Sequence, residues 1–338
     1  MPDCRAIEVI VHNERAGIRL AGTLGLPGED GPYPALLLIP GSGKQDRDET
    51  VSGHRPFRVW ADHLIGRGLA VLRLDDRGVG LSGGDKDQAT HAELLEDLGA
   101  ALDFLTARDD IDPRRLGVLG HSEGAILVAG LAATDSRVSL AVLLAGPGLA
   151  GDQVVLRQAE TLSRAGGASE EEIAHERRMN TQAFQLARSD DEATAIRPRV
   201  VETIRRHLGS WPGGLEIGAD EQEAQAEVMA DVVLAPAFRS LLRADPSSAL
   251  RQLRCPVLAL NGQRDLQVEP ETNLDAIRRA LDAHRHPFTI VELVPGVNHL
   301  FQECATGRIE EYESIVEDVS SRVLSLVADW IAGCWGLA

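Results

Sequence analysis

The chain of 338 residues carries 52 acidic and 34 basic side chains, a formal net charge of −18, with 43% hydrophobic and 25% charged residues. This length exceeds the ~250–300 residues at which a single core stops growing, and the composition excludes a disordered or fibrous protein. The acidic charge repels phosphate backbones and anionic lipid surfaces, so we expect no nucleic acid and no membrane as a partner.

The first elements in chain order are predicted to be an antiparallel hairpin. Residues 7–11 and 18–24 alternate apolar with polar side chains and are separated by the turn formers Asn13 and Gly17. Residues 35–39 then form a continuous apolar run, which is typical of a strand buried on both faces. Its neighbours are therefore expected to be parallel strands.

Further short apolar runs, ended by Gly, Asp or Asn, predict five more strands: residues 69–74, 116–119, 140–144, 257–260 and 288–293. Helical patterns lie between several of them, for example at residues 92–107, where Thr90 and Glu93 form a T-x-x-E capping box. Strands that alternate with helices predict an α/β fold: a mostly parallel central sheet with helices on both faces.

The alternation stops between residues 150 and 235. This stretch has no convincing strand and is rich in Ala, Glu, Gln and Arg, which predicts a helical insertion. We therefore expect a core made of residues 1–149 and 236–338, with residues 150–235 as a helical cap. Such a cap can act as a lid that excludes water from a site at the sheet edge, or it can merely pad the fold.

The pentapeptide Gly120-His-Ser-Glu-Gly124 has the context of a nucleophile elbow. It follows the predicted strand at 116–119 and precedes an apolar helical run at residues 125–133. A turn this tight requires glycine and raises the hydroxyl of Ser122 above the sheet at a helix N-terminus. Ser122 is therefore the candidate nucleophile.

A serine nucleophile needs a base and an acid that orients the base, and in this topology both follow later strands. Asp265 comes after the strand at 257–260, and His299 comes after the strand at 288–293. The sequence thus predicts Ser122, Asp265 and His299 as a catalytic triad. Glu269 remains an alternative acid, since it lies four residues beyond Asp265.

Acyl transfer also requires backbone donors for an oxyanion, each worth about 100- to 1,000-fold in rate. The N–H of Glu123 is one candidate. The turn at residues 40–43, Pro-Gly-Ser-Gly, follows an earlier strand at the place where a second donor arises. We expect the N–H of Ser42 there, with that of Gly43 as the next candidate. The carboxylate of Glu123 is expected to complement the positive end of the following helix.

The chain resembles bacterial α/β-hydrolase esterases that carry a Gly-Ser-Gly-x-x-Asp-Arg-Asp signature. The resemblance covers nearly the whole chain and rests on these motifs: Gly41–Asp48, Arg55–Phe57, Leu74–Ser82, the Gly-His-Ser-Glu-Gly elbow, Leu144–Gly148, Asn261–Asp265 and Asn298–Phe301. It implies an α/β-hydrolase fold and a carboxylic ester hydrolase whose triad falls on Ser122, Asp265 and His299. Pro40 departs from the wider fold, where many relatives have the histidine of a His-Gly turn.

Charged residues beside the predicted oxyanion turn allow two interpretations. Asp46, Arg47, Asp48 and His54 can contact substrate, or they can brace the loop through salt bridges. Nothing in the sequence separates these interpretations.

The expected reaction is cleavage of a small-molecule acyl ester through an acyl-enzyme intermediate. An amidase, a peptidase or an acyltransferase would use the same triad, and a binding protein without activity could share the fold, so these alternatives stay open. No H-E-x-x-H motif and no Cys/His cluster occurs, so we expect no metal and no cofactor. Four widely spaced cysteines, with no signal peptide and no apolar run near ~18 residues, predict a cytoplasmic protein; the oligomeric state is left open.

Overall fold

The structure is a computed structural model that describes residues 4–214, 217–282 and 286–337. The chain divides into two compact units. The first unit is made of Met1–Leu149 and Asp245–Ala338, and the second is made of Ala150–Ala244. All strands of the central sheet belong to the first unit, so this unit provides the frame of the candidate site.

The chain begins with the expected antiparallel hairpin. Strand β1 (Arg5–Asn13) pairs with β2 (Ile18–Leu26) along its whole length, from Arg5 opposite Leu26 to Asn13 opposite Ile18. Gly17 closes the turn with a φ of 65°, a left-handed conformation that glycine adopts without a steric cost. The prediction of a hairpin at this end is confirmed.

Eight strands form one sheet in the order β1-β2-β4-β3-β5-β6-β7-β8. The remaining strands are β3 (Tyr33–Ile39), β4 (Ala70–Leu74), β5 (Ile111–His121), β6 (Val138–Leu144), β7 (Val257–Gly262) and β8 (Ile290–Val294). Strands β1, β2 and β4 are joined by antiparallel pairs, and every pair from β4 to β8 is parallel. The prediction of a mostly parallel sheet is confirmed.

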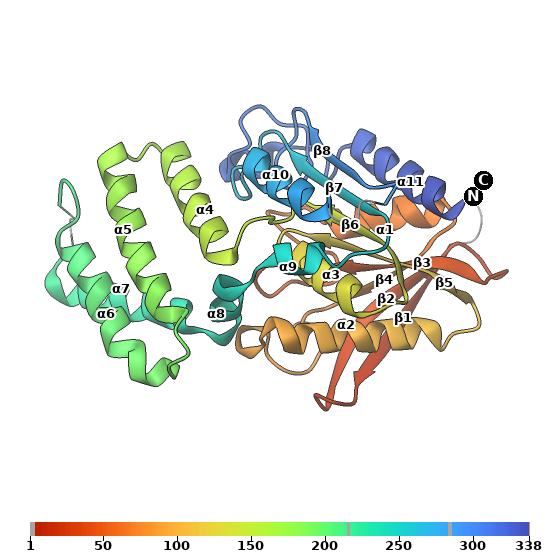
Figure 1. The fold of residues 1–338 in the computed structure, drawn as a ribbon, viewed down its shortest axis with the longest axis horizontal. Helices are drawn as coiled ribbons and strands as arrows, with labels where there is room; N and C mark the ends of the chain where they lie inside the picture. The colour runs from red at the N-terminus through yellow and green to blue at the C-terminus, as the bar shows by residue number, and fades with distance from the viewer. Residues whose placement is uncertain (1–3, 215–216, 283–285, 338) are drawn as a thin grey trace. The chain divides into compact units, whose positions relative to one another are not determined.

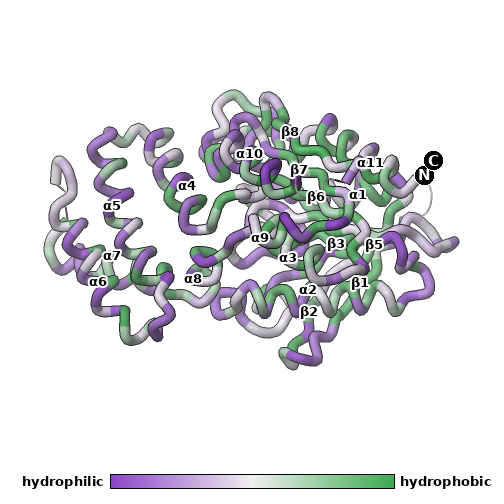
Figure 2. Tube along the Cα trace, viewed as in Figure 1, coloured by the Kyte–Doolittle hydropathy of each residue, from purple (hydrophilic) through white to green (hydrophobic). Residues whose placement is uncertain are grey.

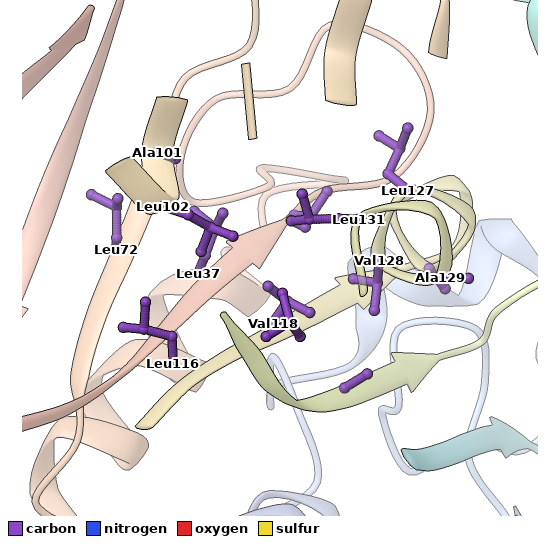
Figure 3. Packing of buried hydrophobic residues seen from close by; sticks show 14 of the residues in the cluster. Leu37, Leu72, Ala101, Leu102, Leu116, Val118, Leu127, Val128, Ala129 and Leu131 are labelled. Carbon is purple, nitrogen blue, oxygen red and sulfur yellow. The ribbon is translucent and has the colours of Figure 1, made fainter. Parts of the chain in front are cut away.

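Helices cover both faces of the sheet (Figure 1). The first face is covered by α2 (His91–Thr106), α3 (Glu123–Thr134), α9 (Pro246–Leu250) and α10 (Pro270–Leu281). The other face is covered by α1 (Pro56–Gly66) and α11 (Ser321–Trp335). Figure 3 shows how buried side chains of β3, β4 and β5 pack against α2 and α3.

Helix α2 begins as its sequence predicts. The hydroxyl of Thr90 accepts a hydrogen bond from the N–H of Glu93, and the Glu93 carboxylate accepts one from the N–H of Thr90. This capping box satisfies two of the N–H groups that a helix leaves unpaired at its start. A cap of this kind stabilises the helix by about 1 kcal/mol.

The second unit is all helical within the residues that the structure describes. Its helices are α4 (Gly151–Ala165), α5 (Glu170–Ala187), α6 (Ala193–Gly209), α7 (Ala219–Leu234) and α8 (Pro236–Arg243). They enclose a hydrophobic cluster of their own, in which the rings of Phe184 and Phe238 meet edge to face at 5.7 Å. The unit extends to Ala244 rather than to residue 235, because Phe238 and Leu242 of α8 pack into this cluster.

The two ends of the second unit meet at a narrow neck, formed by Gly151 and Ala244. The N–H of Gly151 donates a hydrogen bond of 2.8 Å to the carbonyl of Ala244. A Cβ atom at Gly151 would lie 1.8 Å from the carbonyl oxygen of Leu241, so only glycine permits this approach. The chain therefore enters and leaves the insertion at adjacent points.

Apolar residues concentrate in the strands of the sheet, whereas hydrophilic stretches alternate with apolar ones along the helices (Figure 2). This distribution follows from the hydrophobic effect, which favours the burial of one face of each helix. Across the described ranges, no helix combines the length and the apolar character that a membrane span requires.

Candidate active site

Ser122 occupies a sharp turn between β5 and α3. Its φ and ψ are 54° and −121°, a conformation that a residue other than glycine adopts only at a cost of about 1–3 kcal/mol. The N–H of Ser122 donates to the carbonyl of Leu144 at 2.9 Å, which fixes the turn to the end of β6. The strained turn therefore holds a half-buried serine side chain at the carboxyl edge of the sheet.

Glycines on both sides of Ser122 permit close backbone contacts. A Cβ atom at Gly120 would lie 2.4 Å from the carbonyl oxygen of Gly124. At Gly124 it would lie 2.2 Å from the carbonyl oxygen of Ile39 at the end of β3. The elbow motif thus has a steric cause, because α3 can begin against β3 only if these side chains are absent.

Asp265 and His299 meet in a buried hydrogen bond. Nδ1 of His299 lies 2.7 Å from Oδ2 of Asp265, and the two residues are 4% and 3% exposed. The other carboxylate oxygen, Oδ1, accepts the N–H groups of Gln267 at 2.8 Å and Val268 at 2.9 Å. The carboxylate therefore has a fixed orientation and directs Nδ1–H of His299 toward itself, which leaves Nε2 as the basic nitrogen.

The imidazole of His299 lies next to the elbow through its contacts with His121. Nε2 of His121 lies 3.0 Å from the carbonyl oxygen of His299, and the two ring centroids are 4.6 Å apart. Ser122 is the next residue in the chain. Its hydroxyl is not hydrogen-bonded to His299 among the described residues, as is common in free enzymes, where this contact tightens once substrate binds. The structure thus brings all three predicted residues to one edge of the sheet.

Glu269, the alternative acid, has a different role. Its carboxylate accepts the N–H groups of Glu271 and Thr272, both at 3.1 Å, and so forms the N-terminal cap of α10. The bonded partner of His299 is Asp265.

The turn at residues 40–43 lies directly beside Ser122, the candidate nucleophile. A Cβ atom at Gly41 would lie 3.2 Å from the Cβ of Ser122. The N–H of Gly41 donates to Oε1 of Glu49 at 2.7 Å, and its carbonyl accepts Nζ of Lys86 at 3.1 Å. Gly41 is therefore fixed on both sides and its own N–H is committed, so the next amides along the turn, those of Ser42 and then Gly43, remain the candidate donors.

Glu123 supplies the third candidate N–H, at the first position of α3. Its carboxylate does more than complement the helix, because Oε1 lies 2.7 Å from Nε2 of His91 in α2. Burial alone would raise the pKa of this carboxyl, but the hydrogen bond to His91 and the charge of Lys86 outweigh it and lower the pKa. The side chain is thus an ionised brace between α2 and α3.

The charged residues of the signature brace the loop. Asp46 accepts the N–H of Asp48 at 3.0 Å, and Arg47 donates to both carboxylate oxygens of Asp75 at 3.1 and 2.8 Å. Asp48 forms an ion pair with Arg73, whose pKa burial lowers to about 10. The interpretation of these residues as loop-bracing salt bridges is the one that the contacts support.

Sequence reasoning missed two buried residues of the site, Glu49 and His121. Their exposed fractions are 2% and 6%, and Nδ1 of His121 lies 2.9 Å from Oε1 of Glu49. The available signals were only positional: His121 belongs to the elbow pentapeptide, and Glu49 directly follows the charged signature. No spacing rule pairs residues from two such distant segments.

Comparison with protein families agrees with this architecture. A model described as the alpha/beta hydrolase family matches residues 36–311. Esterase EstD from Thermotoga maritima is 28% identical over 315 residues, which cover 92% of this chain and 65% of that protein. The chain thus spans less than two thirds of the length of this relative.

Two solved structures have a similar fold. An esterase from Pyrococcus furiosus matches 97% of this chain and 91% of its own, with a TM-score of 0.57 and 15% identity. A proline iminopeptidase-related protein from Thermus thermophilus matches 99% of this chain and 100% of its own, with a TM-score of 0.56 and 18% identity. At these identities the likeness concerns the fold alone.

Proposed function

Because the chain belongs to the alpha/beta hydrolase family and has that fold, we propose that it is a serine hydrolase that cleaves a carboxylic ester through an acyl-enzyme intermediate. The observation that carries the proposal is the buried 2.7 Å hydrogen bond between His299 and Asp265 beside the strained turn at Ser122. The esterase relative at 28% identity supports an ester as the substrate class.

In the first step of the proposed reaction, Nε2 of His299 takes the proton of the Ser122 hydroxyl while Oγ attacks the ester carbonyl carbon. The tetrahedral intermediate collapses as the imidazolium gives that proton to the leaving alcohol. An acyl group then remains on Ser122. Asp265 accepts the hydrogen bond of Nδ1–H throughout, without taking the proton, and stabilises the imidazolium.

In the second step, water attacks the acyl-enzyme. Nε2 of His299 takes a proton from the water, and its return to Oγ releases the carboxylic acid and restores Ser122. In both steps the negative charge on the former carbonyl oxygen is stabilised by the N–H groups of Glu123 and Ser42, with Gly43 as the alternative to Ser42.

The test is hydrolysis of p-nitrophenyl esters from acetate to decanoate, comparing the native chain with Ser122→Ala. We expect activity in the native chain and its loss by at least about 1,000-fold in the variant. The matched control is Ser139→Ala, since Ser139 lies in β6 and its hydroxyl donates to the carbonyl of Leu116, away from the elbow. The control should keep the activity.

A native chain that cleaves none of these esters would contradict the proposal. Labelling with a fluorophosphonate then separates the remaining cases. Labelling of Ser122 would indicate a nucleophile with another acyl substrate, such as an amide or an acyl-transfer donor, whereas no labelling would indicate a binding protein on this fold.

A further inference from the structure

The imidazole of His121 is held between two hydrogen-bond acceptors. Nδ1 lies 2.9 Å from Oε1 of Glu49, and Nε2 lies 3.0 Å from the carbonyl oxygen of His299. A neutral imidazole carries one N–H and can donate only one of these bonds. With Glu49 ionised, both bonds form only when both ring nitrogens carry protons, so the geometry points to an imidazolium at His121.

Glu49 supplies the negative charge that matches this cation. Its Oε1 accepts both the ring N–H of His121 and the backbone N–H of Gly41, at 2.9 and 2.7 Å. Its other carboxylate oxygen, Oε2, is buried and has no hydrogen-bond partner in the described part of the chain. Glu49 also has a φ of 53°, which costs energy for a residue with a side chain. The contacts of the carboxylate offset that cost.

The pair therefore connects three segments that the reaction uses. Gly41 belongs to the turn that precedes the oxyanion donor Ser42, His121 precedes the nucleophile, and His299 provides the base. A change in the charge of the pair therefore alters the positions of Gly41 and His299, on both sides of Ser122.

We propose that Glu49 and His121 form a charged clamp that positions the oxyanion turn and the His299 loop around Ser122, and that the proton of His121 is required for full activity. This inference rests on the proposed serine hydrolase function. Both residues are positioning residues, because they act through Gly41 and His299 and do not touch the reacting atoms.

The groups that face His121 favour the doubly protonated form of its imidazole. Burial by itself lowers the pKa of this imidazole, but the Glu49 carboxylate, the carbonyl of His299 and the charge of Asp265 outweigh burial and raise the pKa above its ordinary value. Below the raised pKa the clamp is intact. As the pH rises through it, His121 loses one proton and must give up one of its two bonds, so activity falls on the alkaline side.

The test is the pH profile of kcat/KM and kcat for a p-nitrophenyl ester from about pH 6 to pH 10, a range that begins near the ordinary histidine pKa and extends above it. In Glu49→Gln the carboxylate charge is lost, so we expect the alkaline fall to move to lower pH. In His121→Gln nothing titrates at this position, so we expect a lower plateau, by up to about 100-fold in kcat, without that alkaline fall. KM should stay within about twofold.

A second histidine pair provides the matched control. Nδ1 of His54 lies 2.6 Å from Asp318, and its Nε2 lies 2.8 Å from the carbonyl of Tyr312, so it repeats the two-acceptor arrangement without Glu49 or His121. Asp318→Asn should lower the stability and leave the alkaline fall in place. An equal shift in Asp318→Asn, or an unshifted fall in Glu49→Gln, would overturn the proposal.

The proton count of His121 is measured independently of catalysis. In ¹⁵N spectra of the full chain carrying Ser122→Ala, the ring signals that disappear on adding His121→Gln belong to His121. We expect two protonated ring nitrogens at neutral pH, and a single one would refute the clamp even in an active esterase. If instead the native chain cleaves no ester while both nitrogens are protonated, the proposed function fails and the charged pair stands.

Discussion

At the scale of single residues, the two oxygens of Asp265 have separate tasks. Oδ2 accepts Nδ1–H of His299, and Oδ1 accepts two backbone N–H groups in the loop that follows. Three donors thus converge on one buried carboxylate, and each needs an acceptor. An amide at this position has only one acceptor oxygen, so it cannot serve both sides.

We therefore expect Asp265→Asn to lower kcat by about 1,000- to 10,000-fold with little change in KM, because the amide favours the wrong tautomer of His299. Steady-state kinetics on the best p-nitrophenyl ester measure this effect. The comparison variant is Glu269→Ala, which removes the cap of α10. It should cost about 1 kcal/mol of stability and keep the activity. The reverse result would make Glu269 the acid.

The same scale shows what sequence could and could not predict about the site. Ser122, Asp265 and His299 were predictable because each follows the carboxyl end of a strand, where the topology of the sheet brings side chains together. The contact between Glu49 and His121 was not, since the residues are 72 positions apart and belong to no shared motif. Buried partners of a site depend on packing that no local pattern encodes.

At the scale of elements, the junction of β5 and α3 against β3 determines the position of the candidate nucleophile, Ser122. The backbone of α3 begins so close to β3 that Gly124 leaves no room for a methyl group against Ile39 or Pro40. The obstacle is backbone, which cannot rotate away as a side chain can. The turn at residues 40–43 follows β3 directly, so a shift at Gly124 also moves the candidate oxyanion donors.

Gly124→Ala should therefore lower the free energy of unfolding by at least about 1–3 kcal/mol and reduce kcat as well. The control is Gly99→Ala in α2, where an added Cβ would meet no atom within 4 Å. That variant should gain about 0.5–1 kcal/mol, because alanine loses less conformational entropy in a helix. Urea unfolding with ester kinetics on both variants is the measurement. Equal effects of the two would show that steric fit at the elbow is unimportant.

The positions of the strands follow from hydrophobic patterns, but their ends do not. The predicted strand at 116–119 is the apolar centre of β5, which starts at Ile111 although residues 112–115 are Asp-Pro-Arg-Arg. The strand predicted at 288–293 is β8, which runs from Ile290 to Val294 because it pairs with β7 over that range. Hydrogen bonding to a neighbouring strand sets these ends. The sequence of a single segment does not show which strand it pairs with or in which register.

At the scale of the whole molecule, the chain builds two units with separate cores. The second unit buries its own apolar side chains, among them Phe184, which is 5% exposed and contacts Phe238. Each unit therefore has an independent source of hydrophobic stabilisation. The two are expected to respond separately to a core substitution.

Phe184→Ala should remove about 3–5 kcal/mol from the stability of the second unit, since it deletes a buried aromatic ring and leaves a cavity. In hydrogen exchange we expect faster exchange of amides in α5, α6 and α7, while β3, β5 and β6 keep their protection. Faster exchange spread evenly over both units would contradict separate cores.

The end of the second unit could not be located from the sequence alone. The predicted insertion ends at residue 235, directly before Pro236, and proline ends many helices. In the structure it occupies the first turn of α8, where its missing N–H costs nothing, and the helix belongs to the second unit. The same residue can open an element or close one, and only tertiary contacts decide which.

The contact between Gly151 and Ala244 allows the inserted segment to be replaced as a unit during evolution. Because the insertion begins and ends at adjacent points, a recombination event there replaces one segment without lengthening the path that the sheet must close. Changing the inserted length severalfold alters the closure free energy by only about 1–2 kcal/mol. Descendants of this gene can therefore exchange the insertion while they keep the sheet and the edge that carries the candidate site, so the two parts can evolve separately.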